Sequence, residues 1–354
     1  MRRRLAMLAV IGALLALPAG ASAAAASGEV WTATLSGGAE VPAVSTSASG
    51  TATFVLSPDG TTIHYLIQYA GLSGALAAAH IHLGAVGANG GVMLPFVAGP
   101  SPMVGTLTAS SFVATGGVTD FSGAIAAIRA GNAYVNLHTA ANPAGELRGQ
   151  IAAATGAQGF IAPMNGSQEV PPVSGAAAGT GVVVINAAGD SITYWVAYSG
   201  TTSAPAAGHI HLGAPGANGG VLLPLSGVGT SPVVGTLGAT NLTPTGGITT
   251  FAGALDAIRA GTTYLNFHTA ANPAGEFRGQ IGVTVAAPAP SPTPAPTTQP
   301  TPKPTPAVTV PPTSTVTAAP GSPAGPGPAA LLVLVLAGVL GGALAVPMIR
   351  RPRR

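Results

Sequence analysis

Short runs in which apolar and polar residues alternate recur along the first half of the chain, separated by glycine, proline, asparagine and serine. Such alternation is typical of β-strands with one buried face. It predicts strands at 30–35, 50–56, 63–69, 78–83, 104–107, 133–139 and 147–152. A short helix is predicted over 121–130, where Ile125 and Ile128 share a face and Gly131 can adopt the left-handed conformation that ends a helix.

The second half of the chain repeats this pattern because the sequence is duplicated. The stretch "HIHLGAVGANG", which begins at His80, returns 129 residues later as "HIHLGAPGANG", which begins at His209. The first unit covers residues 29–153 and the second covers residues 158–285. Many short strands at this spacing favour an all-β class, and we predict two tandem Greek-key, immunoglobulin-like β-sandwich domains.

Both ends of the chain differ from the duplicated part. Residues 1–23 combine three arginines, an apolar run and a small-residue cleavage site, which predicts a signal peptide. Residues 286–328 are rich in proline and threonine and predict a disordered, extended stalk. Residues 329–349 carry no charge over a length that can cross a membrane as a helix, and the arginines of 350–354 predict a cytoplasmic tail. We therefore expect a single-pass cell-membrane protein whose domains are extracellular.

Charge and cysteine content narrow the range of functions. The formal net charge is +3, but residues 28–287 hold four arginines and nine acidic residues. A mildly acidic folded part lacks the basic patch that nucleic-acid binding requires, so we expect no nucleic-acid partner. The absence of cysteine excludes disulfides, thiolate metal sites and cysteine nucleophiles.

Polar residues at alternating positions define a candidate site. Residues two apart in a strand share a face, so the two histidines of "HIH" point one way and the isoleucine between them the other. The same alternation places the asparagine and histidine of "NLH" together, and the glutamate and arginine of "GELRG" follow a predicted type I turn. We expect one polar cluster in each unit, consisting of His80, His82, Asn136, His138, Glu146 and Arg148 in the first and His209, His211, Asn266, His268, Glu276 and Arg278 in the second.

Two roles of this cluster stay open. One is a structural hydrogen-bond network without a cofactor, in which Glu146 accepts from Arg148 or a histidine and His138 bonds to the backbone. The other is a metal centre, since neutral imidazoles suit zinc, copper or iron and three protein ligands with an open position are typical of a catalytic centre; zinc or copper is the expected ion. The metal ligands would be His80, His82 and His138 in one unit and His209, His211 and His268 in the other.

The motifs "LSGGAEVPAV", "HIHLGAVGANG" and "YVNLHTAANPAGELRGQI", together with "HIHLGAPGANG" and "YLNFHTAANPAGEFRGQI", resemble the CHRD (chordin-type) domain family. The resemblance covers both units and implies a β-rich extracellular module without assigned catalytic residues. Chordin itself antagonises bone morphogenetic proteins, but this chain lacks chordin's cysteine-rich modules. In bacteria the domain occurs in secreted or surface proteins. The histidine pair is also similar to the copper-binding strand of copper–zinc superoxide dismutase, although the chain lacks that enzyme's cysteines and zinc loop.

We therefore expect a cell-surface-anchored binding or structural module. Its partners would be the membrane, through the C-terminal helix, and an unknown extracellular protein or surface ligand. The alternative is a metal-binding or redox protein, similar to superoxide dismutase, that uses a three-histidine cluster in each domain. The serines near the histidines lack a nucleophile-elbow sequence, and the glycine loop lacks the Gly-Lys-Ser/Thr ending of a phosphate-binding loop, so a non-enzymatic role is favoured.

Overall fold

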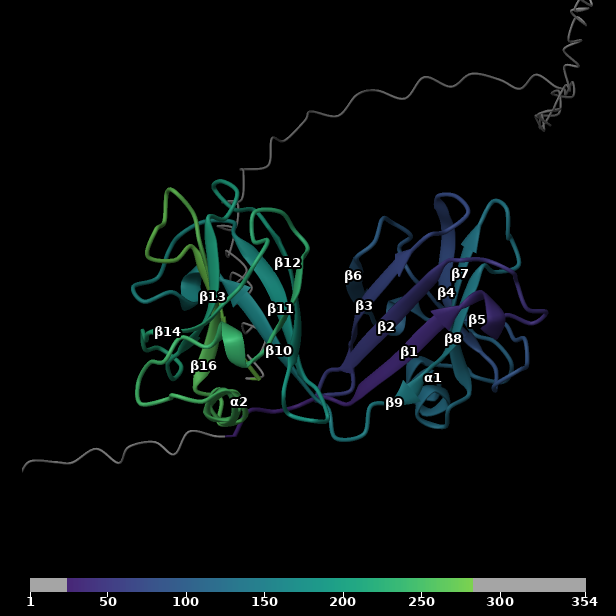
Figure 1. Ribbon diagram of the computed structural model, residues 1–354, viewed down its shortest axis with the longest axis horizontal. Helices are drawn as coiled ribbons and strands as arrows, with labels where there is room; N and C mark the ends of the chain where they lie inside the picture. The colour runs from purple at the N-terminus through teal and green to yellow at the C-terminus, as the bar shows by residue number, and fades with distance from the viewer. Residues whose placement is uncertain (1–23, 283–354) are drawn as a thin grey trace, which may run out of the picture. The chain divides into compact units, whose positions relative to one another are not determined.

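The structure, a computed structural model, describes residues 24–282. Within this range each copy of the repeat forms one all-β domain, and the chain colour in Figure 1 runs from purple to teal through the first and from teal to yellow-green through the second. The all-β class and the two domains predicted from the sequence are thereby confirmed. The predicted signal peptide, stalk, transmembrane helix and cytoplasmic tail lie outside the described residues. Within residues 24–282, no helix is long and apolar enough to cross a membrane.

The two domains have closely similar element orders. The first contains β1 (Val30–Ser36), β2 (Ser49–Leu56), β3 (Ile63–Ala70), β4 (Leu76–Leu83), β5 (Val92–Pro95), β6 (Met103–Leu107), α1 (Phe121–Arg129), β7 (Ala133–Thr139), β8 (Leu147–Gln150) and β9 (Ala152–Ala153). The second contains β10 (Gln158–Asn165), β11 (Ala178–Ile185), β12 (Ile192–Ser199), β13 (Ala207–Leu212), β14 (Val221–Pro224), β15 (Val233–Leu237), α2 (Phe251–Arg259), β16 (Thr263–His268) and β17 (Phe277–Gln280). Short 3-10 helices lie at Gly37–Ala39, Ala109–Ser111, Gly166–Gln168 and Ala239–Asn241.

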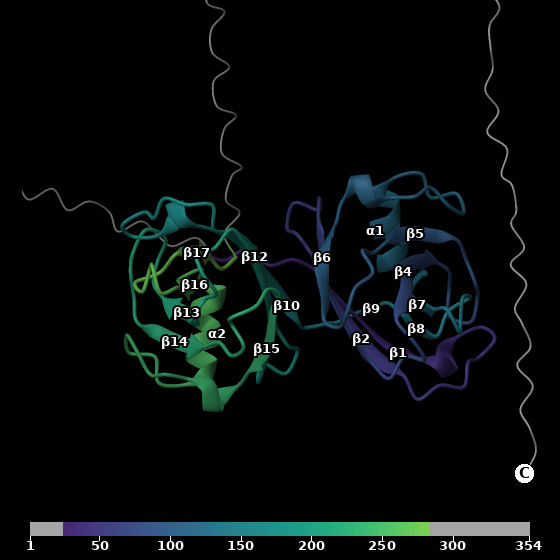
Figure 2. The ribbon, with the colours of Figure 1, turned by 90° about the horizontal axis from the view of Figure 1, so that it is seen from above.

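Each domain is built on one continuous antiparallel sheet. The strand order is β5-β4-β7-β8-β1-β2-β3-β6 in the first domain, with β9 paired to β1, and β14-β13-β16-β17-β10-β11-β12-β15 in the second. The sheet curves into a nearly closed, barrel-like shape, which can be followed in Figures 1 and 2. A sandwich has two separate sheets, whereas here β1 pairs with β2 on one side and with β8 on the other and so joins the two halves.

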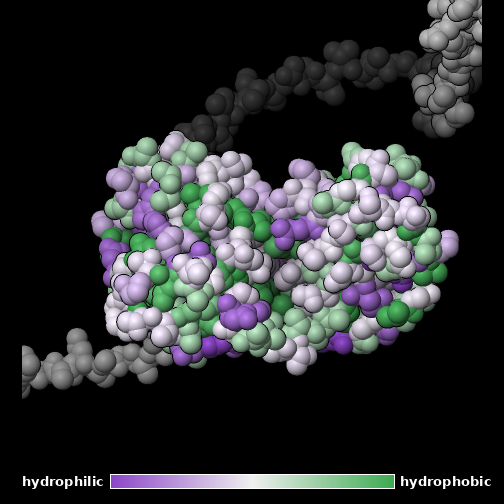
Figure 3. Space-filling model, viewed as in Figure 1, coloured by the Kyte–Doolittle hydropathy of each residue, from purple (hydrophilic) through white to green (hydrophobic). Residues whose placement is uncertain are grey.

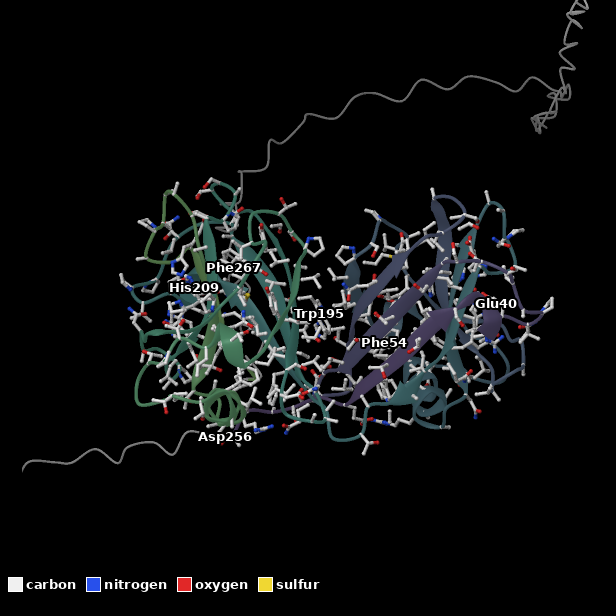
Figure 4. The ribbon with its side chains drawn as sticks, in the orientation of Figure 1. Glu40, Phe54, Trp195, His209, Asp256 and Phe267 are labelled. Atoms are coloured by element: carbon white, nitrogen blue, oxygen red, sulfur yellow. The ribbon has the colours of Figure 1, made fainter. Side chains whose placement is uncertain are left out.

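The apolar core lies inside this curved sheet. In β7, Val135 and Leu137 are fully buried, as the alternation predicts, and Phe54 of β2, labelled in Figure 4, packs in the same cluster. Helix α1 adds Ile125 and Ile128 to the core. The face of the molecule in Figure 3 is mostly pale, and its strongly hydrophilic residues are scattered, which agrees with the low content of charged residues.

One strand of the first domain was not predicted from the sequence, and one predicted strand is divided in two. Strand β5 is a four-residue apolar run without alternation, in which Met93 and Leu94 are both buried. It pairs with β4 across a β-bulge between Ile81 and His82, at the edge of the sheet that carries the histidines. Strand β5 is too short and too uniformly apolar for a prediction from local pattern. The strand predicted over 147–152 is divided into β8 and the two-residue, exposed β9, which pairs with β1.

Candidate functional site

A polar surface in the first domain is carried by β4, β7 and β8. His80 of β4 lies opposite Asn136 of β7, which in turn lies opposite Arg148 of β8. His82 lies opposite Tyr134. Paired residues of neighbouring strands share a face, so these side chains line one surface. We call it the histidine face; its members are His80, His82, Tyr134, Asn136, His138 and Arg148 in the first domain and His209, His211, Tyr264, Asn266, His268 and Arg278 in the second, where Figure 4 labels His209.

The three histidines of the first domain form a compact cluster. Nδ1 of His80 lies 3.2 Å from Nε2 of His138. One ring nitrogen of each histidine, His82 included, lies within 4.8 Å of the other two. His82 is buried, whereas the other two rings are half-buried. The structure thus brings together the three side chains that the sequence places on two separate strands.

Backbone carbonyl groups fix the tautomers of two of these rings. Nδ1 of His82 donates to the carbonyl oxygen of Gly90 at 2.9 Å, and Nδ1 of His138 donates to that of Pro143 at 3.1 Å. A carbonyl oxygen only accepts, so both Nδ1 atoms carry the proton and both Nε2 atoms keep a lone pair. Nε2 of His138 faces His80, but Nε2 of His82 is buried without a hydrogen-bond partner.

Burial keeps these histidines neutral at neutral pH. It lowers the pKa of His80 to about 4, and the neighbouring His138 and His82 add to this effect. Burial also lowers the pKa of His82 and of His138. In the second domain burial lowers the pKa of His209 to about 4. Neutral imidazole is the form that accepts a hydrogen bond or binds a metal ion.

Tyr134 lies between the histidine cluster and Arg148. Its ring stacks on that of His82, with centroids 5.0 Å apart and planes 11° from parallel. The guanidinium carbon of Arg148 lies 3.5 Å from the centre of the same ring. Strands β4 and β8 flank β7, so the two side chains approach the tyrosine from the strands on either side. The cation–π contact stabilises the buried arginine.

The glycine-rich loop between β4 and β5 is held against this surface. Arg148 donates from Nη1 to Oδ1 of Asn89 at 2.9 Å and from Nη2 to the carbonyl oxygen of Ala88 at 2.7 Å. A Cβ atom on Gly90 would lie 1.5 Å from the carbonyl oxygen of Leu83, so only glycine fits there. These contacts place the Gly90 carbonyl that orients His82.

Glu146 belongs to a different network and does not meet the histidines or Arg148. Its carboxylate accepts from the hydroxyl of Thr46 at 2.9 Å, from the backbone N–H of Ser73 at 2.8 Å and from the hydroxyl of Thr139 at 2.7 Å. Burial alone would raise the pKa of Glu146, but these hydrogen bonds outweigh it and lower the pKa to about 2. The expected Glu146–Arg148 contact is absent because Glu146 precedes β8, where strand alternation does not yet apply.

Sequence analysis missed a buried carboxyl group, that of Glu40. Nδ2 of Asn136 lies 3.4 Å from Oε2 of Glu40, and Oε1 of Glu40 and Oδ1 of Asn136 are both buried without a partner. Burial raises the pKa of Glu40 to about 7, against the opposing effects of Arg148 and the Asn136 hydrogen bond. Burial likewise raises the pKa of Glu169 to about 7 in the second domain. The sequence does contain a pattern that could have indicated this glutamate, because "EVP" recurs in the second unit at the same offset as the histidine pair.

The second domain reproduces the histidine cluster. Nδ1 of His209 lies 3.2 Å from Nε2 of His268, as between the corresponding pair of the first domain. Nδ1 of His211 donates to the carbonyl oxygen of Gly219 at 2.9 Å. Nε2 of His211 is again buried without a partner. Both copies of the repeat therefore fold into the same arrangement.

The other predicted residues of the second domain also take equivalent places. The guanidinium carbon of Arg278 lies 3.9 Å from the centre of the Tyr264 ring. Glu276 accepts from the backbone N–H of Thr202 at 2.8 Å and lies apart from the arginine. Oδ1 of Asn266 is buried without a partner, as in the first domain. Each domain thus contains one histidine face and one separate glutamate network.

Comparison with known proteins gives one family. The model of the CHRD domain family matches twice, over residues 31–151 and over residues 160–281. Each match begins in the first strand of a domain and ends directly after β8 or β17. No curated protein and no solved structure matches the chain.

Proposed function

Because the chain belongs to the CHRD domain family, we propose that it is an extracellular binding module whose two tandem CHRD domains each use the histidine face as a binding surface. A signal peptide at 1–23 directs export in this proposal. Residues 329–349 hold the chain in the cell membrane, and the proline-rich stalk 286–328 spaces the domains from it. The ligand is an extracellular molecule that reaches the half-buried side of the histidine cluster.

One observation carries the proposal: the two domains differ at several core positions but at no position of the histidine face. Val135, Leu137 and Leu147 are buried in the first domain, and the equivalent positions hold Leu265, Phe267 and Phe277 in the second. The histidine face, in contrast, has the same residue at every position of both domains. At these core positions one apolar residue replaces another, which a core tolerates when its neighbours adjust, whereas no exchange has occurred on the histidine face.

Buried polar atoms without hydrogen-bond partners at the histidine face also support a binding role. A buried polar atom without a hydrogen bond lowers stability. Each domain contains such atoms at the histidine face, on His82 and Asn136 in the first and on His211 and Asn266 in the second. Polar groups that lower the stability of the fold and make no contact that compensates for the loss are typical of functional sites.

A stability measurement separates binding from a structural role. We would purify the full chain in detergent with a chelator and follow thermal unfolding by the fluorescence of Trp31 and Trp195, both 2% exposed. The variant His80→Ser with His209→Ser should unfold close to the wild-type temperature, since it removes one half-exposed hydrogen bond per domain, worth about 1 kcal/mol.

The matched control is Thr139→Val with Thr269→Val, which removes buried hydroxyls from the glutamate networks. This control should lower the unfolding temperature clearly. If the histidine variant is destabilised as strongly as the control, the face is structural and the proposal fails. The proposed membrane anchor is tested in a separate experiment. Deleting residues 329–354 should move the chain from the membrane fraction to the medium.

A further inference from the structure

We propose that each histidine cluster binds one divalent transition-metal ion, zinc or copper. The ligands are His80, His82 and His138 in the first domain and His209, His211 and His268 in the second. This inference rests on the proposed function, because it names the chemistry that the histidine face recognises.

The spacing of the nitrogen atoms fits such an ion. Tetrahedral zinc lies about 2.0–2.1 Å from imidazole nitrogen, which places two ligand nitrogens about 3.3 Å apart. Nδ1 of His80 and Nε2 of His138 are 3.2 Å apart, and the equivalent distance in the second domain is also 3.2 Å. A hydrogen bond between two neutral rings gives a similar distance, so this spacing admits the metal without requiring it.

The third histidine distinguishes the two explanations. A hydrogen bond between His80 and His138 leaves Nε2 of His82 buried with nothing to bind, as it is in the structure. A metal ion at the cluster supplies the partner for that lone pair. The same unpartnered atom occurs on His211 in the second domain. The same unpartnered imidazole nitrogen at the same place in both domains indicates a ligand that occupies both clusters.

The outer contacts of the rings match those of metal-binding histidines. Such histidines almost always donate the other ring N–H to a carbonyl or carboxylate, which fixes ring and tautomer. Gly90 and Pro143 accept these protons from His82 and His138. The lone pair on Nε2 of His82 is therefore available before any ion arrives, and that of His138, which accepts from Nδ1 of His80, becomes available when His80 shifts its proton from Nδ1 to Nε2.

The donor set selects the class of ion. Each cluster, within the described residues, consists of imidazoles without a carboxylate. Calcium and magnesium require oxygen ligands, whereas imidazole suits zinc and copper. Because His80 and His138 are half-buried, a fourth coordination position remains open on the solvent side. Water or a group of an external molecule fills this position.

Metal content tests the proposal directly. The full chain in detergent is stripped with a chelator, dialysed against zinc or copper at micromolar concentration and analysed for bound metal. We expect two ions per chain, one for each cluster. His138→Ala should retain one ion, and His138→Ala with His268→Ala should retain none. His64→Thr is the matched control, because His64 lies outside the clusters and threonine occupies the equivalent position, Thr193.

A second readout and a second variant distinguish loss of the metal site from loss of the fold. Copper bound by these rings should show nitrogen couplings in its electron paramagnetic resonance spectrum. His80→Ser, which changes a half-exposed ring, should lose one ion while the tryptophan fluorescence stays unchanged. Competition between the two metals identifies the preferred ion. Two ions retained by the His138/His268 variant, or none bound by the wild type, would overturn the metal proposal. In the latter case a stable His80/His209 variant still leaves the histidine face as a binding surface for another ligand.

Discussion

Arg148 stacks on Tyr134 with its guanidinium carbon 3.5 Å from the ring centre, while its nitrogens bind the glycine-rich loop between β4 and β5. The arginine is 2% exposed and lacks a carboxylate hydrogen-bond partner among the described contacts. One side chain thus joins β7, β8 and the loop that carries Gly90. Arg148 acts on the histidine cluster indirectly, as a positioning residue for the carbonyl that orients His82.

Removing Arg148 should destabilise the first domain strongly. In Arg148→Leu the carbonyl of Ala88 and the amide oxygen of Asn89 lose their charged donor, and we expect the free energy of unfolding to fall by about 3 kcal/mol. Denaturant unfolding measures the change. The control is Arg129→Leu, whose half-exposed ion pair with Glu29 should contribute less than about 1 kcal/mol. Equal losses in the two variants would contradict the role given to Arg148.

Glu146 should make stability fall in acid. Its pKa of about 2 in the folded chain lies below the unfolded value of about 4.3, so the carboxylate contributes its full stabilisation above about pH 5. That contribution is lost as the pH falls toward about 2. The difference in unfolding temperature between wild type and Glu146→Gln should therefore be constant near neutrality and shrink in acid. A difference independent of pH would rule out this explanation.

Glu40 and Glu169 should have the opposite pH dependence. Their pKa of about 7 in the folded chain lies above the unfolded value, so their contribution is complete below about pH 4 and is lost as the pH rises through about 7. Glu40→Gln with Glu169→Gln should match the wild type near pH 4 and be more stable than it near pH 9. Thermal unfolding of the chelated protein measures this. The exposed Glu29→Gln is the control, and a variant that is weakened at high pH would refute the prediction.

Gly90 should not tolerate a side chain. In Gly90→Ala the new Cβ would meet the carbonyl oxygen of Leu83, the loop would have to move, and His82 would lose its backbone acceptor. We expect the first domain to lose about 2 kcal/mol of stability, within the range for inserting an atom into a closely packed position. Thermal unfolding is the readout. Gly99→Ala, where nothing lies within 4 Å of the added atom, should behave as the wild type; similar losses in both would argue against this steric explanation.

Local alternation predicted the strands that carry the site. In β7 the pattern placed Asn136 and His138 on one face and Val135 and Leu137 in the core, as the structure has them. Alternation could not predict the order of the strands, because the pairing of β1 with both β2 and β8 depends on segments far apart in the chain. For that reason the sequence suggested two separate sheets where the structure has one curved sheet in each domain.

Residues outside the strands were the ones that sequence reasoning misplaced or missed. Glu146 is bound by Thr46 and Ser73, which lie 100 and 73 residues away along the chain, and no local pattern reports such contacts. Glu40 lies in an irregular segment next to a 3-10 helix, where periodicity gives no orientation. In both cases the glutamate recurs in the second unit, so the duplication was the usable signal.

The alternation in β7 has a consequence for how the chain folds. Slippage of β7 by one residue against β4 would turn Val135 and Leu137 outward and bury the polar side chains, which dismantles the core and the cluster together. The three imidazoles therefore meet only in the native register. Any ligand they hold binds the folded chain alone and draws the folding equilibrium toward it, so occupancy of each cluster reports whether its own domain has folded.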